Sequence, residues 1–191
     1  LLSELQHRVK NSFALIGSMI QLAAGSAKSA EAAAALEEIR LRTNAVSELY
    51  SILYSAKNFT EVEAEPYCRR LVDTLMGISS SVRAELDIED LTLSIRSATA
   101  LGLIITELVT NALKYAYRSG EAGSLRISLR SEGASIRLLV ADSGVGLPPD
   151  FDPAQAGGLG LALVGALAAQ LEGSFTIRSE NGTRCELLFP A

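Results

Sequence analysis

Cysteine, histidine and tryptophan are scarce in this chain of 191 residues, which has two cysteines, one histidine and no tryptophan. Cys68 and Cys185 lie far apart and form no CxxC pair, which argues against a disulfide framework and against a zinc site. The single histidine, His7, excludes a metal site built from several histidines. This cysteine usage is typical of a reducing compartment, so we expect a cytoplasmic protein.

Long hydrophobic runs are also missing. The longest apolar stretch, residues 159–169, contains two glycines and is shorter than the roughly 18 residues of a membrane span, so we expect no membrane contact. The opening residues LLSELQH do not form a signal peptide, and the absence of an initiator methionine suggests part of a longer chain. The net charge of −5 makes nucleic acid an unexpected partner.

Several well-known catalytic motifs are absent. The sequence contains no GxxxxGK[ST], GxSxG or HExxH, and no protein-kinase set of HRD, DFG and β3 lysine. Gly144-x-Gly146 lacks the third glycine of the dinucleotide fingerprint. The hydrophobic fraction of 48% nevertheless predicts a folded protein.

Residues 1–57 are predicted to form an antiparallel helical hairpin. Apolar residues three or four positions apart mark one stripe on the first helix: Leu2, Leu5, Val9, Phe13, Ile16, Ile20 and Ala23. Gly25 ends that helix, and Ser29 can cap a second helix over residues 30–56. A hairpin alone has little core, so we expect a homodimer whose hairpins form a four-helix bundle. Burial of the stripes against the rest of the chain is the alternative.

Residues 58–191 are predicted to form an α+β sandwich, with one sheet covered by helices on a single face. The patterns predict helices over residues 65–76, 97–117, where Ser97 is the cap, and 159–171. They predict strands over residues 59–63, 82–87, 91–93, 124–130, 135–141, 174–178 and 184–189.

Three clusters in this second part indicate chemistry. Glu107, Asn111, Lys114 and Tyr115 have the spacing of one helix face, where carboxylate and amide oxygens suit Mg²⁺ and the ammonium suits phosphates. The alternative is an ordinary solvated face.

The other two clusters are rich in glycine. Asp142 follows a strand and can accept a hydrogen bond from the amine of adenine, while Gly144 and Gly146 leave room for a flat ligand. A run of residues 157–161, with Gly158, Leu159 and Gly160, opens an apolar helix whose backbone N–H groups can bind phosphate. The alternatives are a plain turn and a plain helix start.

Together these segments resemble a known family. ELVTNALKY resembles the N-box, DSGVG the G1 box and GGLGLALV the G2 box of the Bergerat-fold ATPases, which include histidine kinases, type II topoisomerases and heat-shock chaperones. Gly182-Thr183 resembles the pair that closes the adenine pocket. The resemblance implies a Bergerat-type α/β sandwich with a mixed sheet. It also implies ATP and Mg²⁺ as ligands, held by the residues of the three clusters and Thr183, with Asn111 on Mg²⁺ and Glu107 nearby.

The segment Glu4-Leu-Gln-His7-Arg8-Val-Lys10-Asn11 resembles the H-box of histidine kinases related to the HWE group. The resemblance implies that His7 accepts the γ-phosphoryl group of ATP and passes it to an aspartate of a response regulator receiver domain. The chain departs from the strict HWE group because it has no tryptophan, and Arg8 stands where larger kinase families carry an acid. Glu4, one turn earlier, is the candidate base, and Asn11 is a candidate to orient water.

Helix geometry is a second reason to expect that His7 is the phosphoacceptor. Two residues along a helix correspond to a rotation of about 200°, so His7 is expected to face away from the stripe that contains Leu5. An imidazole in water has a pKa of about 6.5 and is mostly neutral at cytosolic pH, hence nucleophilic. An ordinary surface histidine is the alternative.

The sequence therefore predicts an ATP-dependent, autophosphorylating histidine kinase of two-component signalling, with a phosphotransfer hairpin over residues 1–57 and an ATP-binding domain over residues 58–191. One alternative is a non-catalytic phosphotransfer or docking scaffold with a degenerate nucleotide fold. Another is an ATP-driven clamp, which needs a transducer domain that we do not expect after Ala191.

Overall fold

The computed structural model describes residues 2–55, 61–77, 81–118, 121–151 and 159–191. Within these ranges, the side chains of residues 2–7, 10, 34, 38, 41, 45, 48, 52–55 and 159 lie outside the description. The chain divides into two compact units, Leu1–Phe59 and Thr60–Ala191. Each unit is described by itself.

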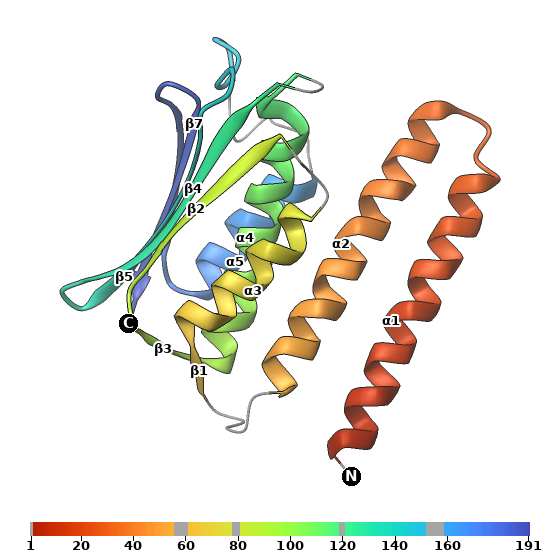
Figure 1. Cartoon of the computed structure of the whole chain (residues 1–191), viewed down its shortest axis with the longest axis horizontal. Helices are drawn as coiled ribbons and strands as arrows, with labels where there is room; N and C mark the ends of the chain where they lie inside the picture. The colour runs from red at the N-terminus through yellow and green to blue at the C-terminus, as the bar shows by residue number, and fades with distance from the viewer. Residues whose placement is uncertain (1, 56–60, 78–80, 119–120, 152–158) are drawn as a thin grey trace. The chain divides into compact units, whose positions relative to one another are not determined.

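The first unit is a pair of antiparallel helices, α1 (Leu2–Gly25) and α2 (Ala30–Ser55) (Figure 1). Ser29 caps α2 as expected, because its Oγ accepts a hydrogen bond of 3.1 Å from the N–H of Ala32. The rings of Phe13 and Tyr50 meet between the helices with their centroids 6.3 Å apart. The helices therefore contact each other through aromatic side chains.

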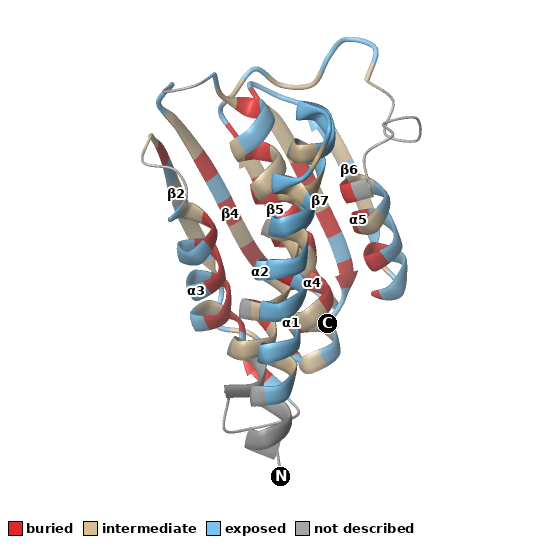
Figure 2. Ribbon diagram, turned by 90° about the vertical axis from the view of Figure 1, so that its right-hand side faces the viewer, coloured by how far each residue is buried: buried red, intermediate tan, exposed pale blue. Residues whose placement is uncertain are grey.

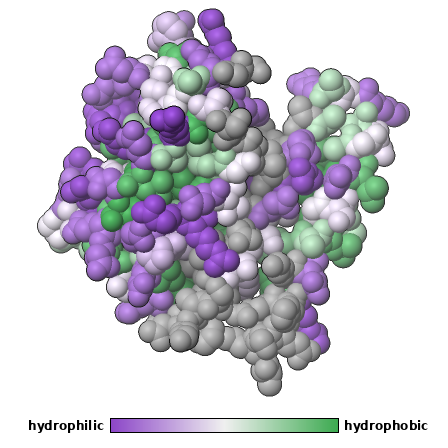
Figure 3. Space-filling model, in the orientation of Figure 1, coloured by the Kyte–Doolittle hydropathy of each residue, from purple (hydrophilic) through white to green (hydrophobic). Residues whose placement is uncertain are grey.

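Several apolar side chains of α1 remain exposed: Leu15 by 59%, Met19 by 59% and Leu22 by 73%. Figure 3 shows hydrophobic surface on this hairpin. Among the described residues of the unit, only Gly17 and Leu49 are buried. The hairpin thus has little core of its own, which is what its amphipathic pattern predicts.

The second unit contains a five-stranded sheet in the order β2-β4-β5-β7-β6. Its strands are β2 (Val82–Ile88), β4 (Gly123–Glu132), β5 (Ser135–Asp142), β6 (Ser174–Ser179) and β7 (Thr183–Pro190). β2 pairs with β4 in parallel and the other neighbours are antiparallel, so the sheet is mixed. The helices α3 (Ala64–Met76), α4 (Ile95–Asn111) and α5 (Leu159–Gln170) cover one face (Figure 1). The predicted α+β class with helices on a single face is confirmed.

Two predicted strands do not join the main sheet. β1 (Glu61–Glu63) and β3 (Thr92–Ser94) form a separate antiparallel pair with Val62 opposite Leu93, so the expectation of one sheet is wrong. Each strand has three residues and buries only its central side chain. The pair brings the beginnings of α3 and α4 together, because each helix starts directly after one of these strands.

The core lies between the sheet and the helices, where Figure 2 shows the buried residues. Along β5, every second residue is buried: Ile136, Leu138, Val140 and Asp142. Successive side chains of a strand point to opposite faces. The carboxylate of Asp142 therefore lies on the same face as the three apolar residues, which is the face covered by helices.

The long helix of this unit differs from its prediction at both ends. Its cap is Ser94 and not Ser97, because the Oγ of Ser94 accepts a hydrogen bond of 3.0 Å from the N–H of Ser97. After Asn111 the chain continues as a π-helix, η1 (Ala112–Ala116), where one α-helix was expected to run to residue 117. Single π-turns are often found at functional sites.

No helix in the described parts of the chain has the length and apolar character needed to cross a lipid bilayer.

Candidate functional site

The carboxylate of Asp142 is the centre of the candidate site. It stands at the end of β5 and is 9% exposed. Its Oδ1 accepts hydrogen bonds from the N–H of Gly144 at 2.9 Å and from the N–H of Thr183 at 3.0 Å. Both bonds end on the same oxygen and fix the plane of the carboxylate. The second oxygen, Oδ2, is the atom to which the amine of a ligand can donate.

The glycines around this carboxylate allow close contact between backbone segments. A Cβ at Gly182 would lie 1.9 Å from the carbonyl oxygen of Asp142, and the φ of Gly182 is +129°. A Cβ at Gly144 would lie 2.1 Å from the carbonyl oxygen of Ala116. Packing within the chain therefore requires both glycines. The predicted contact of Gly144 and Gly146 with a ligand stays a prediction.

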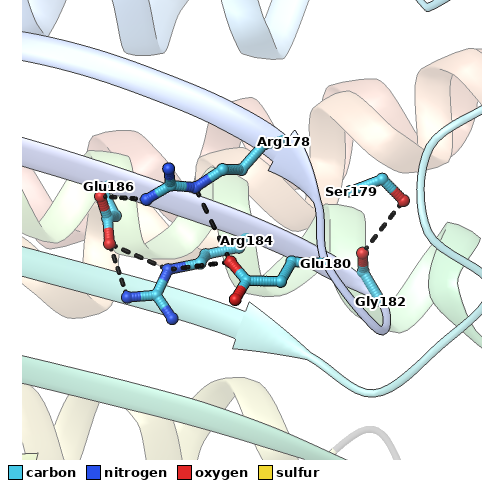
Figure 4. Close-up of polar contacts among 6 residues, drawn as sticks. All are labelled: Arg178, Ser179, Glu180, Gly182, Arg184 and Glu186. Carbon is cyan, nitrogen blue, oxygen red and sulfur yellow. Dashed lines mark hydrogen bonds and ion pairs between the residues drawn. The ribbon is translucent and has the colours of Figure 1, made fainter.

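Ser179 connects the β6–β7 turn to the glycine-rich segment. Its hydroxyl accepts a hydrogen bond of 3.2 Å from the N–H of Leu147 and donates one of 3.3 Å to the carbonyl of Gly182 (Figure 4). Gly146 lies against the same hydroxyl, because a Cβ there would come within 2.3 Å of Ser179 Oγ. The turn that places Thr183 beside Asp142 is thus held to the segment that follows Asp142.

The same hairpin carries a cluster of ion pairs, which Figure 4 shows beside the turn. Arg184 contacts Oε1 of Glu186 at 2.6 Å, and Arg178 contacts Oε2 of Glu186 at 2.9 Å. The hydrogen bond from Arg184, together with the charges of Arg184, Arg178 and Arg137, holds the pKa of Glu186 below its ordinary value. These contacts stabilise the two strands that carry the turn.

Helix α4 and η1 carry the first predicted cluster, and its residues differ in burial. Glu107 is 3% exposed, Asn111 is half-buried, and Lys114 and Tyr115 are exposed. A solvated face is therefore excluded for Glu107. The ammonium of Lys114 lies 4.9 Å from the centre of the Tyr115 ring.

The end of η1 meets the segment after Asp142. The carbonyl of Ala116 accepts a hydrogen bond of 3.0 Å from the N–H of Val145. The end of the helix that carries the first predicted cluster therefore lies beside the segment that carries the second, about thirty positions away in the sequence.

The third cluster is described in part. Gly160 is buried in the first turn of α5. Gly158 lies outside the described residues, and so does the side chain of Leu159. Their predicted contact with phosphate stays a prediction.

The candidate phosphoacceptor belongs to the first unit. Glu4, His7 and Asn11 all lie on α1. The side chains of Glu4 and His7 lie outside the description, whereas Asn11 is exposed. The predicted orientation of His7 stays a prediction.

Both cysteines are buried, and the pKa values of their thiols are raised. Burial, followed by the charge of Asp142, raises the pKa of Cys185 to about 12. Burial, followed by the charge of Glu65, raises the pKa of Cys68 to about 12. Both thiols are buried, so neither is placed to act as a nucleophile.

The residues at the site can supply only some of the ligands of a Mg²⁺ ion. Within the described ranges, no three histidine, cysteine or acidic residues gather around one point. Mg²⁺ is usually bound through one or two protein oxygens together with phosphates and water. Glu107 and Asn111, one turn apart on α4, offer such oxygens.

Two residues of the site were missed from the sequence. Ser179 and Tyr117 act through hydroxyl groups on the backbone of the segment after Asp142. Neither belongs to a glycine-rich or acidic cluster. The only sequence signal was the position of Ser179 just before the turn at Glu180-Asn181-Gly182.

Comparisons with known proteins agree with this geometry. A family model described as histidine kinase matches residues 4–79. A second model, described as histidine kinase-, DNA gyrase B-, and HSP90-like ATPase, matches residues 96–191. The first match includes His7, and the second includes Asp142 and all three clusters.

Curated relatives align with nearly the whole chain. Sensor histidine kinase PdtaS of Mycobacterium tuberculosis is 31% identical over 98% of this chain and 38% of its own length. Blue-light-activated histidine kinase 2 of Erythrobacter litoralis is 29% identical over 99% of this chain and 56% of its own length. This chain therefore spans about two fifths to somewhat more than half of these relatives.

Among solved structures, the histidine kinase domain of the blue-light activated kinase EL346 from Erythrobacter litoralis superposes with a TM-score of 0.71. It is 26% identical and covers 99% of this chain and 90% of that chain. The fold, the site around Asp142 and both family matches lead to one conclusion: the chain belongs to the histidine kinase-, DNA gyrase B- and HSP90-like ATPases and, within them, to the HWE-related histidine kinases.

Proposed function

We propose that the chain is the catalytic part of an ATP-dependent histidine kinase of two-component signalling, in which His7 receives a phosphoryl group and passes it to an aspartate of a response regulator. The observation that carries the proposal is the buried Asp142 carboxylate, fixed on one oxygen by two backbone N–H groups. It occurs in a chain whose only histidine lies within the histidine kinase match.

The second unit binds ATP in this proposal. Oδ2 of Asp142 accepts a hydrogen bond from the amine of adenine, and Thr183 borders the base because its N–H holds the same carboxylate. Lys114 and the start of α5, with Gly158, Leu159 and Gly160, bind the phosphates. Tyr115 lies beside Lys114 and borders the nucleotide.

Asn111 holds Mg²⁺, and Glu107 lies nearby as a further ligand or as an acceptor for bound water. The ion would offset the negative charge of the phosphates during transfer. The protein groups mainly position the nucleotide, because phosphoryl transfer needs little covalent chemistry from its catalyst.

The transfer step takes place on the first unit. An imidazole nitrogen of His7 attacks the γ-phosphorus, a P–N bond forms, and the bond from that phosphorus to the β,γ-bridging oxygen breaks. ADP leaves with the electron pair, and Glu4 accepts the proton that the ring releases. A receiver aspartate then attacks the phosphorus, the P–N bond breaks and the ring takes back a proton. Asn11, one turn after His7, orients a water molecule for dephosphorylation of the partner.

Phosphoryl donation can be measured directly on this chain. Incubation with Mg²⁺ and ATP labelled at the γ-phosphorus is expected to label the protein, whereas ATP labelled at the α-phosphorus is not. Addition of the receiver domain of a response regulator is then expected to remove label from the kinase and to place it on the receiver. Absence of both γ-label and ADP binding would favour the docking scaffold, whose nucleotide fold is degenerate.

An exposed apolar face of α1, beside the stripe predicted from the sequence, fits a second copy of the chain. Leu15, Met19 and Leu22 lie three or four positions apart and share a face, and the hairpin buries little apolar surface by itself. We expect sedimentation equilibrium to give a dimer. Met19→Glu combined with Leu22→Glu is expected to shift it to monomer, since two charges would be buried at the interface.

Gln21→Glu is the matched control for this experiment, because Gln21 is an exposed polar residue of the same helix. It adds charge outside the face formed by Leu15, Met19 and Leu22 and is expected to leave the dimer intact. A monomeric wild-type protein, or a double variant that still dimerises, would rule out this interface.

A further inference from the structure

Tyr117, the first residue after η1, joins three segments that meet at the site. Its hydroxyl donates a hydrogen bond of 2.5 Å to the carbonyl of Ser124, at the beginning of β4. The same oxygen accepts a hydrogen bond of 3.3 Å from the N–H of Ser143, directly after Asp142. One hydroxyl therefore links the end of the helix to both strands beside the carboxylate.

The surrounding contacts hold the Tyr117 ring in place. A Cβ at Gly123 would lie 2.0 Å from Cε1 of Tyr117, so the ring lies directly against the backbone of Gly123. Ser143 and Ser124 are also joined to each other, because the N–H of Ser124 donates to Oγ of Ser143 at 2.9 Å. Burial raises the pKa of Tyr117 above its ordinary value, which keeps the hydroxyl protonated as a donor.

These contacts lead to the carboxylate through one short segment. Ser143 precedes Gly144, whose N–H is one of the two donors to Oδ1 of Asp142. Val145, on the other side of Gly144, donates to the carbonyl of Ala116, which is the neighbour of Tyr117. Ser143 is held both by the hydroxyl of Tyr117 and by the carbonyl of Ser124, which accepts a hydrogen bond of 3.1 Å from the N–H of Ser143. The position of the Gly144 N–H thus depends on anchors at Ser143 and Val145, and residues at the end of η1 contribute to both.

We propose that Tyr117 is a positioning residue for base recognition: its hydroxyl holds Ser143, and through Gly144 it fixes the Asp142 carboxylate in the orientation that selects adenine. Tyr117 touches neither the base nor the phosphates in this role. The inference rests on the proposed nucleotide-binding function, and it adds a residue that determines the specificity of that site.

The variant Tyr117→Phe removes the hydroxyl and keeps the ring against Gly123. Loss of this anchor is expected to weaken binding of ADP about fivefold, the effect of about one ordinary hydrogen bond. IDP carries a carbonyl where ADP carries the amine, so it gains nothing from the correct orientation of Asp142. Its affinity is expected to change little, and the preference for ADP over IDP is expected to fall about fivefold.

Tyr67→Phe is the matched control. The hydroxyl of Tyr67 also donates to a backbone carbonyl, that of Ala98, at 2.7 Å, and it is buried between α3 and α4. Its loss is expected to lower the stability of the unit and to leave the ratio of ADP to IDP affinity unchanged. This control separates a general loss of stability from a loss of the orientation of the Asp142 carboxylate.

Amide hydrogen exchange measures the anchor without any nucleotide. In Tyr117→Phe, the amides of Ser143 and Val145 are expected to exchange faster than in the wild type and in Tyr67→Phe. Unchanged exchange at both amides would overturn the anchor, and faster exchange with an unchanged ADP preference would overturn its role in base recognition. A wild-type protein that binds ADP no better than IDP would instead contradict the proposed role of Asp142, and exchange would still decide whether Tyr117 is an anchor.

Discussion

Asp142→Asn is expected to weaken binding of ADP about 100-fold, because the variant replaces a charged acceptor with a group that donates toward the base. The N–H groups of Gly144 and Thr183 both donate to Oδ1 of Asp142. In the variant these two N–H groups need an acceptor and donate to the amide oxygen of the asparagine. The NH₂ group of the asparagine then occupies the position of Oδ2. Two donors, this NH₂ and the amine of adenine, then face each other.

The same reasoning predicts an inverted preference. IDP presents a carbonyl oxygen at the place of the amine, and that oxygen can accept a hydrogen bond from the new NH₂ group. Isothermal titration of Asp142→Asn with ADP and with IDP is therefore expected to give the tighter binding for IDP. Because both backbone donors keep a partner, urea unfolding is expected to show only a small change in stability. Equal affinity of wild type and variant for ADP would remove Asp142 from the base site.

Gly182→Ala is expected to abolish measurable ADP binding and to destabilise the second unit by at least about 2 kcal/mol. The φ of Gly182 is +129°, a conformation that residues with a Cβ rarely adopt, and the added Cβ would lie 1.9 Å from the carbonyl oxygen of Asp142. A backbone carbonyl cannot rotate away as a flexible side chain can. The turn must therefore move, and Thr183 moves with it away from the carboxylate.

Gly133→Ala is the matched control for this substitution. Gly133 also has a positive φ, +64°, but a Cβ there meets nothing within 4 Å. It lies in the β4–β5 turn, away from Asp142. We expect a loss of only about 1 kcal/mol from its backbone conformation and unchanged ADP binding. If Gly182→Ala bound ADP as Gly133→Ala does, the close contact of the turn with Asp142 would not shape the site.

Much of the fold could be predicted because apolar periodicity is a local signal. The alternation along β5 and the two helices of the hairpin depend on neighbouring residues, and both were predicted from the sequence. The helix cap was not, because Ser94 and Ser97 are equally good caps by residue type. Pairing of β3 with β1, where Ser94 lies opposite Glu61, keeps Ser94 extended and starts the helix directly after it. The π-turn after Asn111 likewise has no local signature.

The candidate site was predictable where chemistry is concentrated in short segments. Asp142, Gly144 and Gly146 lie within five positions of the sequence, and so do Asn111, Lys114 and Tyr115. The hydroxyls of Tyr117 and Ser179 were not predictable, since each contacts a backbone segment about 26 to 32 positions away. The burial of Glu107 also depends on how α4 packs, which no spacing along one helix reveals.

The central claim is that a nucleotide bound beside Asp142 supplies a phosphoryl group to His7. Its most direct test is to incubate the chain with ATP and Mg²⁺ and to locate the added phosphoryl group by mass spectrometry, at neutral to alkaline pH because P–N bonds break in acid. The account predicts phosphorylation on the peptide that contains His7, and none in His7→Gln or in Asp142→Asn. An unmodified wild-type chain that still binds ADP, or a phosphoryl group that persists in His7→Gln, would contradict it.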